Sequence, residues 1–167
     1  VNLRQLVVRR AEEAGVRFEE IRTREIGTDG ADVDTLALSV VAYETAVASE
    51  RFLQWTAPDG RIAAFLRLSL PFPSCVDDLR ERFADFPIGP GEAMIREVHV
   101  YGAVAGLHRT SAGAQHLGLG KRLIEAASSI AREDGCEALN VISAVGTREY
   151  YRGLGFQDKG MYQRKTL

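Results

Sequence analysis

Two glycines one residue apart stand where a helix is expected to begin. Residues 115–120 read Gln-His-Leu-Gly-Leu-Gly, and Lys121 and Arg122 follow directly. Glycine lets the backbone approach a ligand without a Cβ clash. The free N–H groups and the dipole of a first helical turn attract anions. The segment therefore predicts a pyrophosphate site, with a glycine-rich turn that holds no ligand as the alternative. Its residues are Gln115, Gly118, Leu119, Gly120 and Lys121.

Two adjacent tyrosines are the candidate proton donors. Tyr150 and Tyr151 lie in residues 147–154, which are predicted to be helical and end at Gly155. A tyrosine hydroxyl can donate a proton to a leaving group. Neighbouring side chains on a helix point about 100° apart, so one of the two is expected to reach a reacting group. The alternative is a half-buried tyrosine that anchors the helix.

A third candidate group lies on a predicted strand over residues 93–101. Glu97 and His99 alternate with Val98 and Val100 and are expected to share one face of that strand. Either is a candidate general base for an amine nucleophile. A structural, hydrogen-bonded histidine is the competing interpretation, and the side-chain roles stay open here. No cluster of His, Cys and carboxylate side chains suggests a metal, so none is predicted.

The elements that must position these residues follow from hydrophobic spacing and turn residues. Helices are predicted over 3–14, 75–83, 119–134 and 147–154, and strands over 36–44, 46–56, 61–70, 93–101, 138–143 and 156–165. Residues 16–26 are expected to be extended, and 27–34, 86–91 and 102–114 to be loops. The first three strands form an antiparallel meander, and the strand–turn–helix–strand order predicts a parallel crossover. The fold class is α/β with a mixed, mostly antiparallel sheet.

Composition limits the functional classes. A chain of 167 residues with 46% hydrophobic residues fits one domain, and its net charge of −2 argues against a strongly basic nucleic-acid-binding protein. Two distant cysteines give no disulfide framework or zinc motif, which is typical of cytoplasmic proteins. No apolar run is long enough to span a membrane. Because the chain begins at Val1 rather than Met, we expect it to be part of a longer protein.

The motifs resemble those of a known family. Gln115-x-x-Gly118-x-Gly120 is similar to motif A of the GNAT acetyltransferases, and Tyr151-x-x-x-Gly155-Phe156 resembles their downstream tyrosine motif. The resemblance implies the GNAT fold, in which a parallel strand pair splays apart between flanking helices, and acetyl-CoA as cofactor. It implies that Tyr151 donates a proton to the CoA thiolate. It also implies that the pantetheine arm contacts the backbone of Glu97, Val98, His99 and Val100.

Longer blocks resemble the catalytic subunit of Elongator. Arg-Glu-Val-His-Val-Tyr-Gly over 96–102 and the block 141–152 are the most specific of them. The likeness implies an acetyltransferase domain, residues 28–167, preceded by a linker, residues 1–27. It further implies acetyl-CoA-dependent modification of the wobble uridine (U34) of tRNA, giving a carboxymethyl group at C5. Members of that family carry an N-terminal radical-SAM domain with S-adenosylmethionine and an iron–sulfur cluster. This chain has no matching cysteine triad, so that domain is expected to be a partner outside it.

The acceptor is left open between two enzymatic classes. On the tRNA interpretation, basic residues of the linker are candidate phosphate contacts. These residues are Arg9, Arg10, Arg22 and Arg24. The alternative enzyme is a stand-alone N-acetyltransferase that acts on a protein lysine or a small amine. A non-catalytic docking module is the remaining alternative.

Overall fold

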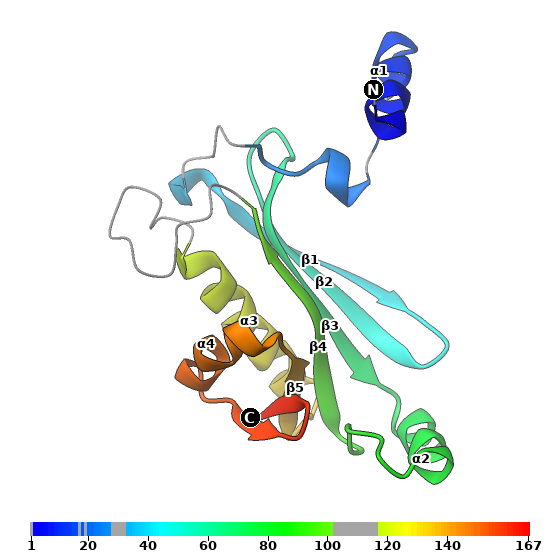
Figure 1. Cartoon of the computed structure of the whole chain (residues 1–167), viewed down its shortest axis with the longest axis vertical. Helices are drawn as coiled ribbons and strands as arrows, with labels where there is room; N and C mark the ends of the chain where they lie inside the picture. The colour runs from blue at the N-terminus through cyan, green and yellow to red at the C-terminus, as the bar shows by residue number, and fades with distance from the viewer. Residues whose placement is uncertain (1, 17, 19, 28–32, 102–116) are drawn as a thin grey trace.

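The computed structural model describes residues 2–16, 18, 20–27, 33–101 and 117–167. It shows one twisted sheet with helices packed around it (Figure 1). The strands are β1 (Ala37–Glu44), β2 (Ala48–Thr56), β3 (Ile62–Pro71), β4 (Glu92–Val100), β5 (Ala138–Ile142), β6 (Gln157–Lys159) and β7 (Tyr162–Thr166). The helices are α1 (Leu3–Glu13), α2 (Pro73–Arg82), α3 (Leu117–Glu133) and α4 (Arg148–Gly153), with short 3₁₀ turns η1 (Ile21–Thr23), η2 (Val33–Thr35) and η4 (Val145–Thr147).

The strand order in the sheet is β1-β2-β3-β4-β5-β7-β6. Strands β1 to β4 pair antiparallel in sequence, as the meander predicts, and the C-terminal strands are also antiparallel to their neighbours. The described part of the sheet has one parallel pair, β4 with β5, connected through α3. The predicted α/β class, with a mixed and mostly antiparallel sheet, is confirmed.

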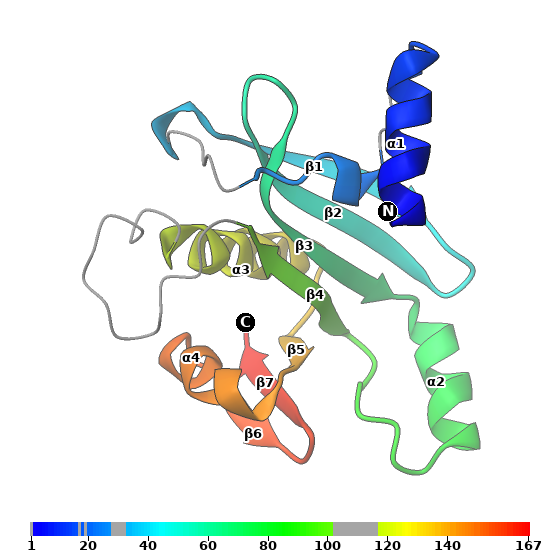
Figure 2. The same ribbon diagram turned by 45° about the horizontal axis from the view of Figure 1, so that its top comes forward.

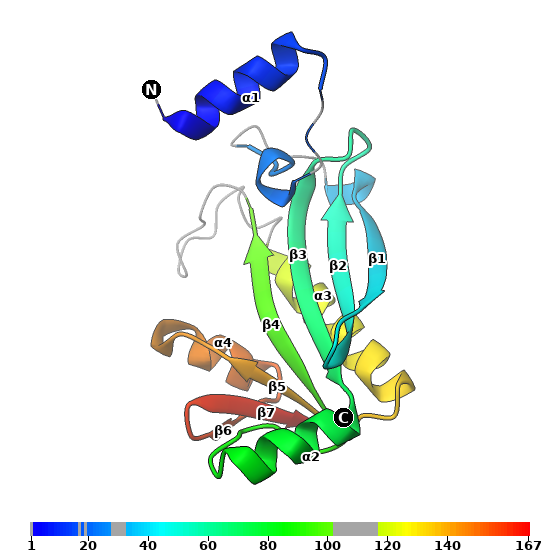
Figure 3. The same ribbon diagram turned by 90° about the vertical axis from the view of Figure 1, so that its right-hand side faces the viewer.

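Helix α3 forms the core by covering one face of the sheet (Figure 3). Its apolar residues recur every three or four positions, and five of them are essentially inaccessible to solvent: Leu119, Leu123, Ile124, Ala127 and Ala131. They belong to one cluster with the inward-facing residues of β2, β3 and β4, such as Leu53, Leu66 and Ile95. Burying each such large side chain stabilises the fold by about 1.5–3 kcal/mol. The start of α3 is thereby fixed against the sheet.

A β-bulge interrupts β4 and changes which side chains share a face. Arg67 of β3 pairs with Glu97 but Leu68 pairs with Ile95, so Arg96 is an extra residue in β4. Simple alternation, which the sequence suggests, would place Ile95 on the face of Glu97. Ile95 instead lies in the core cluster with the partly buried Val98. Bulges bend a strand and increase its local twist.

The bulge lies where β4 leaves β5. The parallel pairing covers Glu92–Ile95 against Ala138–Val141 and ends there. Beyond this point the two strands diverge (Figures 2 and 3). The backbone of β4 from residue 96 onward therefore keeps β3 as its strand neighbour within the described residues, and its other edge faces a gap. The splayed parallel pair expected from the resemblance is confirmed.

The C-terminal end differs from the expectation in one respect. The sequence predicts one strand over 156–165, but these residues form the hairpin β6–β7. Gly160 at its turn has φ +62°, a left-handed conformation that favours glycine and reverses the chain. Strand β7 then inserts beside β5, and β6 becomes the edge strand.

The N-terminal segment lies partly outside the sheet. Helix α1 projects away from the rest of the molecule (Figures 1 and 3). The expectation of an extended segment over 16–26 is wrong at η1, where hydrogen bonds from Thr23 and Arg24 to residues three positions earlier close 3₁₀ turns. Ile26 is nonetheless buried and hydrogen-bonds to Ile62, which joins the end of this segment to the sheet.

Several expected features lie outside the described residues. These are most of the loop 27–34, the loop 102–114, and Gln115. Among the helices that are described, none has the length and apolar character needed to cross a membrane.

Candidate functional site

A cavity fills the gap between the diverging strands. It measures about 320 Å³ and is lined from three directions. Strand β4 contributes residues 95–98 and Val100, the end of β5 and the following turn contribute 141–144, and the helices contribute Gly120, Thr147, Tyr150 and Tyr151. The two sequence motifs and the predicted strand thus meet at one place, although the lining residues come from positions as far apart in the chain as Ile95 and Tyr151.

The helix start lies at one end of this cavity. Helix α3 begins at Leu117, so the N–H groups of its first turn, from Leu117 to Gly120, have no partner within the helix. Gly118 is exposed, whereas Leu119 is buried in the core. A Cβ atom at Gly120 would lie 3.1 Å from the Tyr150 hydroxyl and 3.5 Å from Val100 Cγ2. Glycine at 120 therefore allows α3 to approach both β4 and α4.

Tyr150 and Tyr151 both line the cavity, whereas their spacing on a helix suggests that one of the two would reach it. Tyr151 is 8% exposed and packs its ring edge-on against Tyr150 and Phe156, with centroid distances of 5.4 and 5.5 Å. Burial, with a smaller contribution from Tyr150, raises the pKa of Tyr151 to about 12. Burial and then Glu125 raise the pKa of Tyr150. Both hydroxyls are therefore protonated at neutral pH and can act as donors.

Glu97 and His99 share a face of β4, as the sequence predicts, and they contact each other. His99 Nε2 lies 2.9 Å from Glu97 Oε1, and Arg67 Nη1 lies 3.6 Å from Glu97 Oε2. The His99 ring stacks on Phe65 with a centroid distance of 5.1 Å. These contacts favour the structural interpretation of His99. Glu97 lines the cavity, but its carboxylate already contacts the His99 imidazole and the Arg67 guanidinium.

The predicted cationic residues are dispersed. Lys121 forms a surface ion pair with Glu125 at 3.7 Å, and the Arg122 guanidinium lies over the Trp55 ring at 4.2 Å. Arg9 and Arg10 are exposed on α1, away from the cavity. Arg22 is exposed on η1, whereas Arg24 donates from Nε to the Gly60 carbonyl at 3.0 Å and holds the β2–β3 turn. Of the four arginines proposed for tRNA, Arg24 is thus engaged within the chain, and the tRNA role of all four stays a prediction.

A buried glutamine supports the wall of the cavity and is not predicted by the sequence. Gln163 on β7 is inaccessible to solvent and accepts a hydrogen bond from Ser143 Oγ at 2.7 Å. Its amide donates to the Arg148 carbonyl and to Asp158 Oδ1. The end of β5 and the start of α4 are thus tied to the C-terminal hairpin. The spacing of residues in the sequence gives no signal for Gln163, because that spacing does not predict the β6–β7 hairpin on which Gln163 lies.

This geometry can be compared with known proteins. The sequence model of the Acetyltransferase (GNAT) family matches residues 20–156, which contain every element that lines the cavity. The chain belongs to the GNAT acetyltransferase family. The matched residues of this GNAT domain include the gap between β4 and β5, the glycine-rich helix start and the tyrosine pair.

This GNAT domain is similar to proteins named Elongator complex protein 3. The chain is 35% identical over 177 residues to Elongator complex protein 3 of Homo sapiens, and 35% identical over 172 residues to that of Saccharomyces cerevisiae. Each match covers 99% of this chain and 30% of the relative. The solved structure of an N-terminally deleted Elp3 from the archaeon Methanocaldococcus infernus matches with TM-score 0.76 and 31% identity, over 98% of this chain and 38% of that one. The chain thus spans about a third of the length of these relatives.

Proposed function

We propose that this chain is the acetyl-CoA-binding acetyltransferase domain of an Elongator-type enzyme that modifies the wobble uridine of tRNA. The domain would supply the acetyl group for carboxymethylation at C5. The observation that carries the proposal is that the gap-facing edge of β4, the start of α3 and Tyr151 meet in one cavity. The similarity to Elongator complex protein 3 supports the choice of acceptor.

The residues around the gap fit acetyl-CoA. Among the described residues, no strand pairs with the edge of β4 that faces the gap, so this edge can bind an extended amide chain in the manner of an added strand. Glu97, Val98, His99 and Val100 would provide these backbone contacts. The first turn of α3, with Gly118, Leu119, Gly120 and Lys121, would hold the pyrophosphate through N–H groups and the helix dipole. Acetyl-CoA supplies an activated acetyl thioester.

Tyr151 would act as the proton donor of the site, with Tyr150 beside it. Its hydroxyl is held protonated by burial, so a hydrogen bond or proton is available to a departing thiolate at neutral pH. An ordinary thiol has a pKa near 8.5, so its thiolate departs readily and needs only a weak acid or hydrogen-bond donor nearby.

The experiment measures acetyl-CoA binding and turnover by the wild-type chain, with and without tRNA. We expect saturable binding and turnover that rises when tRNA is added. Rapid acetylation of lysine peptides with no response to tRNA would favour the stand-alone N-acetyltransferase. Absence of acetyl-CoA binding, even with tRNA, would favour the docking module and overturn the proposal.

A further inference from the structure

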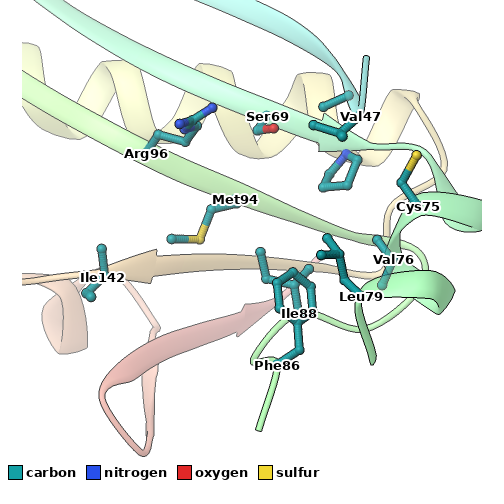
Figure 4. A pocket seen from close by; sticks show the side chains of 12 residues that line it. Val47, Ser69, Cys75, Val76, Leu79, Phe86, Ile88, Met94, Arg96 and Ile142 are labelled. Atoms are coloured by element: carbon teal, nitrogen blue, oxygen red, sulfur yellow. The ribbon is translucent and has the colours of Figure 1, made fainter. Parts of the chain in front are cut away.

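A second cavity lies on the face of the sheet opposite α3 (Figure 4). It measures about 400 Å³, which is within the size range of small-molecule sites. Its apolar wall comes from α2, from the loop that follows α2, and from β4. The residues that form most of this wall are Val76, Leu79, Phe86, Ile88 and Met94.

The two cavities meet at the point where β4 and β5 diverge. Arg96 and Ile142 line both of them. Arg96 is the extra residue of the β-bulge, and Ile142 is the last residue of β5. A group bound in the second cavity would therefore face the candidate thioester site through the gap between the strands.

The Arg96 side chain is held by a buried carboxylate. Its Nη1 lies 3.3 Å from Oε1 of Glu50, whose side chain is 2% exposed and also accepts a hydrogen bond from Ser69 Oγ at 2.8 Å. Glu50 is fixed by burial, whereas the Arg96 side chain is 50% exposed. A guanidinium has five N–H donors, so donors remain for a ligand after the Glu50 contact.

The charged groups at this cavity disfavour a lysine side chain as the acceptor. Among the described residues that line it, Arg96 carries the one ionic group. Because Glu50 compensates this cation, the cavity offers no net charge to offset the desolvation of a bound ion. It therefore disfavours a lysine ammonium and favours an uncharged group with a hydrogen-bond acceptor.

We propose that this second cavity receives the acceptor as an uncharged heterocycle, and that Arg96 donates a hydrogen bond to a carbonyl oxygen on its ring. The proposal rests on the proposed function, because a uracil base belongs to that chemical class. Uracil has a carbonyl oxygen at ring position 4, where cytosine has an amino donor. Arg96 would therefore distinguish the two pyrimidines.

The test uses the two cysteines of the chain. Cys75 lines the second cavity, and Cys136, just before β5, is absent from its lining and serves as the internal control. Alkylation by N-ethylmaleimide is followed by mass spectrometry in the presence of an anticodon stem-loop RNA with uridine at the wobble position. RNA at ten times its dissociation constant should slow Cys75 alkylation about tenfold and leave Cys136 unchanged. The same RNA with cytidine at that position, at equal concentration, should protect Cys75 much less.

The variant Arg96→Gln tests the assigned contact. It should remove the difference between the uridine and cytidine RNAs, whereas Arg132→Gln on the exposed side of α3 should keep it. Because Arg96→Gln leaves the Glu50 carboxylate buried without its cation, the double variant Arg96→Gln/Glu50→Gln is measured as well and should give the same result. A good base contact of this kind discriminates by about tenfold or more.

Three outcomes would overturn the inference. The first is that the uridine RNA leaves Cys75 alkylation unchanged. The second is that the uridine and cytidine RNAs protect Cys75 equally. The third is that a lysine peptide, added in place of the RNA, protects Cys75 as well as the uridine RNA does. Acetyl-CoA binding is measured separately on the same protein. Binding of acetyl-CoA without protection of Cys75 would remove this inference and leave the proposed function standing.

Discussion

Tyr151 differs from Tyr150 in one physical respect, its burial. The Tyr151 ring is part of the core cluster, so its hydroxyl is positioned by packing, whereas Tyr150 is 40% exposed. A proton donor needs a fixed position relative to the leaving group. We therefore assign the donor role to Tyr151 and a lesser role to its neighbour.

The substitution Tyr151→Phe tests this assignment. It keeps the ring and its packing and removes the hydroxyl, so we expect kcat for acetyl-CoA turnover to fall by about 10²-fold with little change in KM. Because its pKa is about 12, we also expect wild-type kcat to show no loss from tyrosine ionisation below about pH 10. Steady-state kinetics across pH measures both, with Tyr150→Phe as the control. Equal losses in the two variants would contradict the assignment.

The sequence predicts the residues of the cavity better than their contacts. Tyr151 and Gly120 can be placed because each lies in a short motif, and Val98 can be placed through the resemblance to the GNAT family. Arg96 cannot be placed, because a single bulge residue leaves no mark on the hydrophobic pattern of β4. Its partner Glu50 lies on β2, 46 residues away, and local spacing carries no information about such a contact.

At the scale of elements, the start of α3 carries the proposed pyrophosphate site. A Cβ atom at Gly118 would meet no atom within 4 Å, so Gly118→Ala is sterically tolerated in the protein alone. It should stabilise α3 by up to about 1 kcal/mol, because alanine has the higher helix propensity. The added methyl group should nevertheless obstruct the approach of a pyrophosphate to the helix backbone. We expect acetyl-CoA binding to weaken about tenfold in calorimetric titrations.

Gly153→Ala provides the matched control for this prediction. Gly153 also lies in a helix, and a Cβ atom there would likewise meet no atom within 4 Å, but Gly153 is the last residue of α4 and lies outside the first turn of α3, where the pyrophosphate is proposed to bind. The substitution should leave acetyl-CoA affinity unchanged. If Gly118→Ala bound acetyl-CoA as tightly as Gly153→Ala does, the pyrophosphate site would have to lie elsewhere.

The elements themselves are largely predictable. The apolar stripe predicts a helix over 119–134, and α3 matches it within two residues at each end. The C-terminal hairpin is missed because its turn contains one glycine, and runs of polar residues lie on both sides of it. Pairing of β7 with β5, which that hairpin makes possible, is a long-range event that no local pattern specifies.

At the scale of the whole molecule, Glu92 joins three strands where the parallel pairing of β4 with β5 begins. Its carboxylate accepts hydrogen bonds from Asn140 on β5 at 3.0 Å and Arg164 on β7 at 2.8 Å. Burial raises the pKa of Glu92. The bonds from the Gly89 N–H, Arg164 and Asn140, with nearby Lys159, outweigh burial and lower that pKa from 4.5 to about 2. A charged network thus holds together β5, β7 and the beginning of β4, on the paired side of the gap.

This network predicts a pH dependence of stability. Because the folded-state pKa is below the ordinary value, the contribution of Glu92 is complete above about pH 5 and is lost as the pH falls toward 2. Glu92→Gln should lower the free energy of unfolding at pH 7 by about 1–2 kcal/mol after allowance for solvent screening. Urea denaturation at pH 7 and at pH 3 measures the effect. The difference between wild type and variant should shrink at pH 3, and an unchanged difference would contradict this account.

The most direct test of the central claim is calorimetric titration of the wild-type chain with acetyl-CoA, in the absence and presence of tRNA. The account predicts saturable binding with one site per chain, at the cavity where β4, α3 and Tyr151 meet. Absence of binding under both conditions would contradict it.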